Sequence, residues 1–126
     1  YDILGIFMAI EHKFIGITET ALLTVPAAKQ YAITTIIVCN TYVPNPSDDQ
    51  EGLATFDLHL IPNGQSRGDI NRIINQMSLR AGETFTFDSE KIIIESSDSI
   101  VGIGTPDDIT NPGNTTLAVV ISYLEI

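Results

Sequence analysis

The stretch ATFDLHLIP, residues 54–62, decides the fold class because its hydrophobic residues alternate with polar ones. A period of two residues is typical of a β-strand that buries one face and exposes the other. The predicted inward-facing set is Ala54, Phe56, Leu58 and Leu60. The predicted outward-facing set is Thr55, Asp57 and His59.

Working outward from this strand, similar short segments recur between clusters of Pro, Gly, Asn and Asp. ETFTF (83–87) alternates in the same way, with Phe85 and Phe87 inward and Thr84 and Thr86 outward. YAITTIIVCN (31–40) and TTLAVVISYLEI (115–126) are apolar on both faces, which is typical of central or interface-covered strands. Further strands are expected in TALLTV, KIIIE and SIVGI. About seven or eight strands predict an all-β fold, a single antiparallel β-sandwich of jelly-roll or immunoglobulin-like type.

Residues 69–79, DINRIINQMSL, are open to two interpretations. Ile70, Ile73, Ile74 and Met77 match a helical period, with Asp69 placed as N-cap. The isoleucines and asparagines lower helix propensity, however. With a period of two, Ile73, Asn75, Met77 and Leu79 share one face of a strand. We predict a strand that begins near Arg72, with a helix as the alternative.

We predict two parts of the chain, residues 1–10 and a sandwich domain over residues 11–126. YDILGIFMAI (1–10) is apolar but too short to span a bilayer, and it lacks the basic start and cleavage pattern of a signal peptide. We expect it to be an arm that docks on a neighbouring chain or an edge strand.

Charge limits the possible partners. The net charge is −10 with only six Lys and Arg, which argues against nucleic acid and against anionic membrane surfaces as partners. Cys39 is the single cysteine, so no intramolecular disulfide forms, and we expect it to be a small buried hydrophobe. The fold must be held by packing or by oligomerisation.

Few residues suggest a chemical site. Asp57 and His59 share a strand face and offer two metal ligands, but no third ligand follows, so a solvated or interface-facing pair is the preferred interpretation. His12 beside Glu11 is predicted to lie at the surface. The acidic loops PSDDQEG (46–52) and TPDDITNPGN (105–114) contain oxygen ligands that suit Ca²⁺ but also the residues that turns require.

No catalytic motif is recognisable. The sequon at Asn114 matters only in a secreted eukaryotic protein. We therefore predict no enzyme activity, no catalytic residues, no metal and no cofactor, and we leave the binding residues unassigned.

Arg67-Gly68-Asp69, within PNGQSRGDIN, matches a well-known adhesion tripeptide. The same segment has the composition of a turn between two strands. Gly64 and Gly68 permit left-handed backbone, and Asn63 and Asp69 can bond their own backbone. We interpret the triplet as a turn.

The order of several motifs resembles the small β-sandwich virion proteins of tailed bacteriophages, which are accessory proteins of capsids, tails and fibres. The matching pieces, over residues 15–126, are TVPAAK, ITTIIVCN, FDLHLIP, LRAGETF, SDSI and LAVVISYLEI. Two positions depart from the family pattern, because Ala28 and Ser97 stand where that family has glycine in turns.

The resemblance implies a non-enzymatic structural virion protein. Its expected partners are identical subunits, as a homotrimer or higher assembly, together with major capsid or tail proteins. The alternative is a host-surface glycan-binding module of a tail fibre or spike. Sugar sites often stack on exposed aromatic rings, and only Tyr42 lies in an obvious loop.

Overall fold

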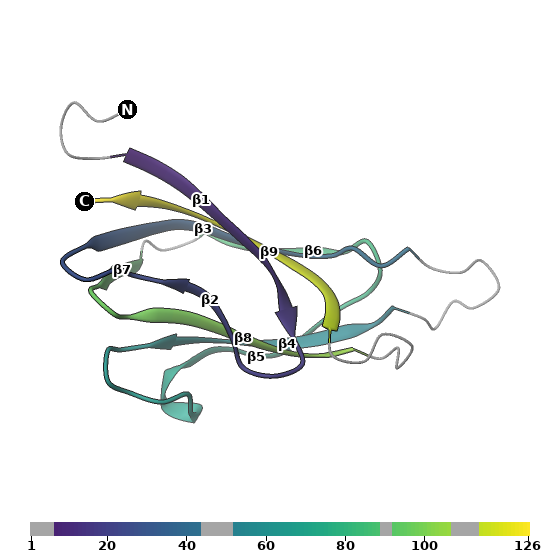
Figure 1. Ribbon diagram of the computed structural model, residues 1–126. Coiled ribbons are helices and arrows are strands. Elements are labelled where there is room, and N and C mark those ends of the chain that lie inside the picture. The colour runs from purple at the N-terminus through teal and green to yellow at the C-terminus, as the bar shows by residue number, and fades with distance from the viewer. Residues whose placement is uncertain (1–6, 44–51, 89–91, 107–113) are drawn as a thin grey trace.

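Two antiparallel sheets pack face to face in the computed structural model, which describes residues 7–43, 52–88, 92–106 and 114–126 (Figure 1). The upper sheet of the figure, sheet A, contains β1 (Phe7–Gly16), β3 (Gln30–Asn40), β6 (Thr84–Phe87), β7 (Ile92–Glu95) and β9 (Asn114–Glu125). The lower one, sheet B, contains β2 (Thr20–Thr24), β4 (Ala54–Ile61), β5 (Arg72–Leu79) and β8 (Ser99–Pro106). One short 3₁₀ helix, η1 (Asp69–Asn71), precedes β5.

The strand order identifies the kind of sandwich. Sheet A has the order β1-β9-β3-β6 with β7 also paired to β3, and sheet B has the order β2-β8-β4-β5. Because β6 and β7 pair with successive halves of β3, they serve as one interrupted strand. The result is an eight-stranded jelly roll. The predicted all-β sandwich is confirmed, and the strand order selects the jelly-roll alternative.

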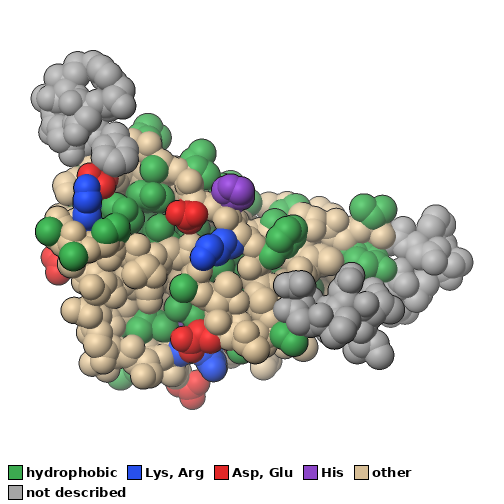
Figure 2. Space-filling model, in the orientation of Figure 1, with side chains coloured by type: hydrophobic (Ala, Val, Ile, Leu, Met, Phe, Trp, Pro, Cys, Tyr) green, Lys and Arg blue, Asp and Glu red, His purple; other side chains and the backbone are tan. Residues whose placement is uncertain are grey.

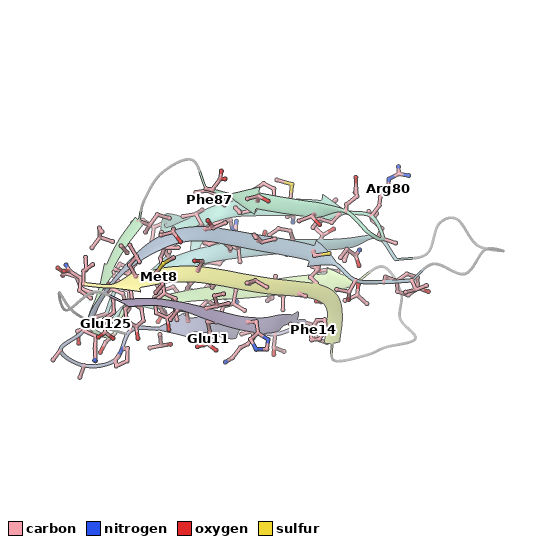
Figure 3. The ribbon with its side chains drawn as sticks, turned by 90° about the horizontal axis from the view of Figure 1, so that it is seen from above. Met8, Glu11, Phe14, Arg80, Phe87 and Glu125 are labelled. Atoms are coloured by element: carbon pink, nitrogen blue, oxygen red, sulfur yellow. The ribbon has the colours of Figure 1, made fainter. Side chains whose placement is uncertain are left out.

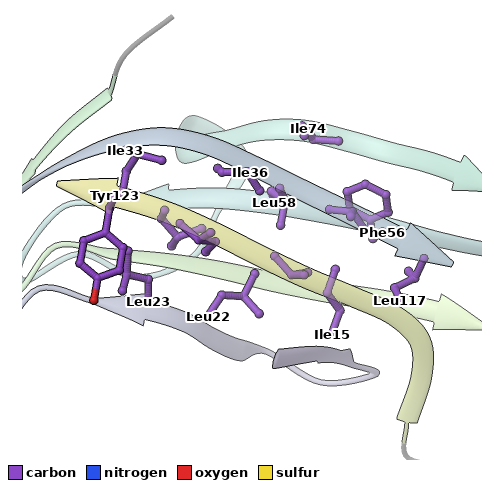
Figure 4. Close-up of a cluster of buried hydrophobic side chains, with 14 of the residues drawn as sticks. Ile15, Leu22, Leu23, Ile33, Ile36, Phe56, Leu58, Ile74, Leu117 and Tyr123 are labelled. Atoms are coloured by element: carbon purple, nitrogen blue, oxygen red, sulfur yellow. The ribbon is translucent and has the colours of Figure 1, made fainter. Parts of the chain in front are cut away.

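The core fills the space between the sheets (Figure 4). Ile36 and Leu117 of sheet A and Leu58 of sheet B are fully buried. Each such side chain contributes roughly 1.5–3 kcal/mol by leaving water. Tyr31 and Tyr123 stack with their ring centroids 4.3 Å apart. Burial raises the pKa of Tyr123, and the neighbouring Tyr31 raises it further.

Asn40 ties the two sheets together at the end of β3. It is fully buried, and its Nδ2 donates to the carbonyl oxygens of Gly52, at 2.5 Å, and Leu79, at 2.9 Å. Its Oδ1 accepts from the Thr116 hydroxyl at 2.6 Å and from the Tyr42 amide at 3.1 Å. A buried amide bonded at both ends stabilises a unique arrangement of its neighbours.

The predicted facing of β4 and β6 is largely confirmed. Ala54, Phe56 and Leu58 are buried, and Leu60 is partly buried against the core. In β6 the two phenylalanines are less exposed than the two threonines. Phe85 contacts Phe56 edge to face, with centroids 6.2 Å apart.

The strand predicted to begin near Arg72 is confirmed, and η1 occupies the residues just before it. Its predicted facing is partly wrong. Ile74 is buried and Asn75 is exposed, because the pairing of β4 with β5 shifts register between Phe56 and Leu58. Gln76 in this bulge has φ +51°. A bulge breaks the period of two on which the prediction depended.

β1 pairs with β9 along the edge of sheet A and runs without interruption through the predicted boundary between residues 10 and 11. Residues 1–6 lie outside the described residues, so the docking arm stays a prediction there. Cys39 was expected to be buried in the core, but it is half-buried on the outer side of β3, since Val38 and Asn40 take the inward positions.

The two turns at which the chain departs from the phage family pattern have left-handed backbone. Ala28 has φ +62° and Ser97 has φ +68°. Glycine adopts this conformation without steric cost, whereas other residues do not. The two turns lie against each other, since the Ala28 amide donates to the Ser96 hydroxyl at 3.2 Å and the Ser97 amide to the Val25 carbonyl at 2.8 Å.

Candidate interaction face on sheet A

The outer surface of sheet A is an apolar and uncharged face. Alternation along each strand points one set of side chains into the core and the other set outward. Three outward residues of β1 are large, apolar and exposed: Met8 at 72%, Ile10 at 67% and Phe14 at 55%. Figure 3, which views the sheet from above, labels Met8 and Phe14 near the two ends of β1.

Strand pairing arranges the outward side chains in four rows across the sheet, which together we call the sheet A face. The rows are Met8-Leu124-Ala32-Ile93, Ile10-Ser122-Thr35, His12-Val120-Ile37-Thr86 and Phe14-Ala118-Cys39-Thr84. These residues include no Asp, Glu, Lys or Arg. A contiguous apolar surface of this kind is typical of a protein interaction site.

One hydroxyl of the sheet A face, that of Ser122, is bonded to a neighbouring residue of the chain. The Thr34 hydroxyl, at the bulge of β3, lies 3.0 Å from both the carbonyl oxygen and the hydroxyl of Ser122. Covering this part of the sheet with another protein therefore leaves the Thr34–Ser122 pair bonded.

Charged groups lie at the margins of this face. Glu95 ends β7 beside Gln30, whose Nε2 donates to it at 3.3 Å, and Lys29 pairs with Glu125 at 3.1 Å at the same end of the sandwich. Glu11 and Lys13 occupy the alternate positions of β1, and Lys13 Nζ donates to the Ala21 carbonyl. An apolar centre with a polar rim is the usual composition of a protein interface.

The outer side of sheet B differs, because the chain covers it with its own residues. His59 was expected to be solvated or interface-facing, but it is fully buried. Its Nδ1 lies 2.9 Å from Oδ1 of Asn71, at the end of η1. Asn71 Oδ1 also accepts from the Gly68 amide, while its Nδ2 donates to the Ser66 carbonyl. This network makes Nδ1 of His59 the donor and holds the 66–71 segment against β4.

Asp57 bonds the backbone of the bulge in β5. Its carboxylate accepts from the Gln76 amide at 2.5 Å, and its second oxygen lies 3.9 Å from Nε of Arg72. His59 Nε2 and Arg72 Nε are buried without hydrogen-bond partners. In the described ranges no three His, Cys, Asp or Glu side chains gather as a metal site would require. The preferred interpretation of Asp57 and His59 as a solvated or interface-facing pair is wrong for His59, whose ring is fully buried.

A polar depression of about 330 Å³ lies on the outer side of sheet B. Its lining includes Thr55, Asp57, Arg67, Gln76, Ile103 and Thr105. Figure 2 shows one group of acidic and basic side chains on the lower side of the molecule and others at its upper left and centre, with hydrophobic side chains along the upper edge.

The Arg67-Gly68-Asp69 triplet is bonded within the chain. Arg67 Nε lies 3.0 Å from Glu19, and Asp69 lies 3.1 Å from Arg72. Gly64 has the predicted left-handed backbone at φ +83°, but the same prediction for Gly68 is wrong, since its φ of −168° is ordinary extended backbone.

The remaining candidate residues are placed as follows. His12 is exposed, as predicted, and lies within the sheet A face. Tyr42 is half-buried, and its ring lies close against Gly52. Most of the acidic loops 46–52 and 105–114 lies outside the described residues, so calcium binding there stays untested. Within the described part of the chain, no helix has the length and hydrophobicity needed to cross a membrane.

No model of a known protein family matches the chain. No curated protein matches it in sequence. Solved structures that are similar to this chain include the following two. One is a chain of the acidic stable capsid structure of Helicobacter pylori bacteriophage KHP30, with 9% identity, a TM-score of 0.48, and coverage of 95% of this chain and 86% of that one. The other is a chain of infectious bursal disease virus, Gx strain, with 14% identity, a TM-score of 0.49, and coverage of 95% of this chain and 31% of that one.

Proposed function

We propose that this chain is a non-enzymatic structural protein of a virion, which associates with identical subunits and attaches to a capsid or tail as an accessory subunit. The observation that carries the proposal is the sheet A face, an uncharged surface on a chain of net charge −10. An acidic protein that worked alone would gain solubility by placing charges there. Large exposed residues in that position indicate that a neighbour covers them.

The virion assignment comes from the sequence resemblance, and the backbone supports it at two points. Ala28 and Ser97 replace the family's turn glycines, and both have positive φ, the conformation for which glycine is suited. The motif ITTIIVCN forms β3 and the motif LAVVISYLEI lies in β9, the two central strands of sheet A. The same motifs therefore supply seven of the fifteen residues of the sheet A face.

The test is quantitative mass spectrometry of purified virions from the phage whose genome encodes the chain, against the major capsid protein. Hundreds of copies would place the chain on the shell, and a few copies or a few tens would place it in the tail, neck or fibre. Absence from the particle would overturn the virion proposal.

The second candidate function is a glycan-binding module of a fibre or spike. The polar depression on sheet B supports it, because Asp57, Arg67 and Gln76 bring acceptors and donors to one hollow. Tyr42 counts against it, since the ring packs against Gly52 and does not line that hollow. Titration of the chain with a saccharide panel, followed by amide chemical shifts of residues 55–57 and 103–105, would test it.

A further inference from the structure

His12 occupies the interior of the sheet A face. Its row continues through Val120 and Ile37, and Ile10 and Phe14 lie on either side of it along β1. His12 is exposed in the single chain. It is the only basic side chain of the face, so its protonation would place one positive charge inside an otherwise uncharged surface.

No charged group faces His12 from the neighbouring strands. β9 presents Val120 beside it, β3 presents Ile37, and β6 presents Thr86. Glu11 and Lys13 alternate with His12 on β1 and therefore point to the opposite side of the sheet. The other titratable side chain of the face is the thiol of Cys39, one row away and two strands across. Asp88 follows β6 at the far edge of the sheet from β1.

The charge of the chain identifies the occupant of this surface. Two copies that each carry a net charge of −10 repel each other when most of their surfaces approach. Sheet B, for example, presents Glu19, Asp57 and Asp69 around its covering loop. Contact through the sheet A face brings no carboxylate of one face against another. A basic partner would instead be drawn to the acidic surfaces. Each copy has the same uncharged face, so two copies supply both halves of a contact.

We propose that the sheet A face binds a second copy of this chain, with His12 inside the contact, so that protonation of His12 in mild acid separates the copies. The inference rests on the self-association in the proposed function. To that self-association the inference adds the surface that makes the contact, the molecule that binds there and the pH at which the two copies separate. In a trimer or larger assembly the same contact would join the subunits.

The area of the sheet A face indicates how tightly two copies should associate. Four strands about 4.8 Å apart and about 25 Å of strand length give roughly 500 Å² per copy. That is below the roughly 800 Å² per partner of a standard interface. We expect a dissociation constant on the order of tens of micromolar, which repetition on a particle would strengthen through avidity.

The pH dependence follows from desolvation of the imidazolium. An ordinary imidazole titrates near pH 6.5, and burial without an anionic partner disfavours its charged form. At pH 5.5 the dissociation constant should be about tenfold higher for each His12 that the contact buries, compared with pH 7.5. Carboxylates titrate near pH 4, so their charge changes little over this interval.

The experiment is sedimentation velocity of the full chain from about 5 to 500 µM at pH 7.5 and 5.5 and at constant ionic strength. His12→Gln keeps a polar side chain that cannot titrate, and His12→Lys carries a permanent charge. We expect the unmodified chain to associate at pH 7.5 and to lose at least tenfold in affinity at pH 5.5. His12→Gln should associate equally at both pH values, and His12→Lys should stay monomeric at both. Both variants keep His59, so a pH dependence that remains in both variants does not come from His12.

Each other outcome overturns a defined part of the inference. Equal association of the unmodified chain at both pH values overturns the role of His12 and leaves self-association standing. Association that survives Val120→Lys overturns the assignment to the sheet A face. A chain that is monomeric at every concentration and pH overturns the inference as a whole. If that monomer binds virions that lack it, and Val120→Lys abolishes the binding, the occupant is a capsid or tail protein and the proposed function stands.

Discussion

The outer sides of the two sheets use their side chains in opposite ways. On sheet B, Asn71 binds the buried His59, Asp57 binds the Gln76 amide, and Arg67 reaches Glu19, so the chain covers its own sheet. On sheet A the outward residues of β1, β9 and β3 are, apart from His12, apolar or hydroxyl-bearing, and nothing within the described residues folds over Met8, Ile10 or Phe14. Sheet B is completed within the subunit, whereas sheet A has the composition of a surface that a neighbour completes.

Substitution of the two histidines is the strongest test of the difference between the outer sides of the two sheets. His59→Ala should lower the free energy of unfolding by about 3 kcal/mol, because it removes a fully buried ring and the donor to Asn71. His12→Ala, on the exposed side of sheet A, should change it by less than about 0.5 kcal/mol. Urea denaturation followed by circular dichroism, at a concentration where the chain is monomeric, measures both. Equal effects would mean that the two outer sides are alike.

A carboxylate placed on each face tests the same contrast in association. Val120→Glu introduces a charge at the centre of the sheet A face and should weaken self-association by about 2 kcal/mol or more, roughly 30-fold. Thr105→Glu adds the same charge to the exposed rim of sheet B and should change the dissociation constant by less than about twofold. Sedimentation velocity at pH 7.5 compares the two. Equal weakening would attribute the effect to net charge and not to the face.

Glycine substitutions in the turns that connect the two sheets should change the stability of the chain independently of what covers either sheet. Ala28→Gly and Ser97→Gly should each raise the free energy of unfolding by about 0.5–1 kcal/mol, because positive φ costs a non-glycine residue more than the added chain entropy of glycine. Ala27→Gly, in the same turn but without positive φ, is the matched control and should lower it by about 0.5 kcal/mol. Thermal unfolding measures all three, and a loss of stability in all three would refute the left-handed assignment.

The features of the fold that could be predicted from the sequence are those decided by residues close together in the chain. Features decided by contacts between distant segments could not be predicted. Alternation along 54–60 and 83–87 is local, so the strands and their inward residues could be predicted. The apolar faces of β3 and β9 correctly indicated central strands. The strand order that separates a jelly roll from an immunoglobulin-like sandwich depends on pairings between distant segments, such as β1 with β9, and local patterns do not encode it.

For the candidate site, too, only the features that depend on nearby residues could be predicted from the sequence. Met8, Ile10, His12 and Phe14 alternate with Ala9, Glu11 and Lys13, so a period-two search across the predicted boundary at residue 10 could have found the outward side of β1. The burial of His59 could not have been found, because it depends on Asn71, twelve residues away across a turn.

The smallest effect concerns the triplet Arg67-Gly68-Asp69. Arg67→Ala removes the ion pair with Glu19, whose side chains are 33% and 53% exposed, so water and salt screen it. The free energy of unfolding should therefore change by less than about 0.5 kcal/mol. Asn71→Ala should cost more, about 1–2 kcal/mol, because it breaks the contacts to His59, Gly68 and Ser66 together. Urea denaturation of the two variants ranks them. The predicted order means that the buried His59–Asn71 network holds the covering loop of sheet B in place. The reverse order would assign that role to the surface charges, and the two faces would then differ in charge alone.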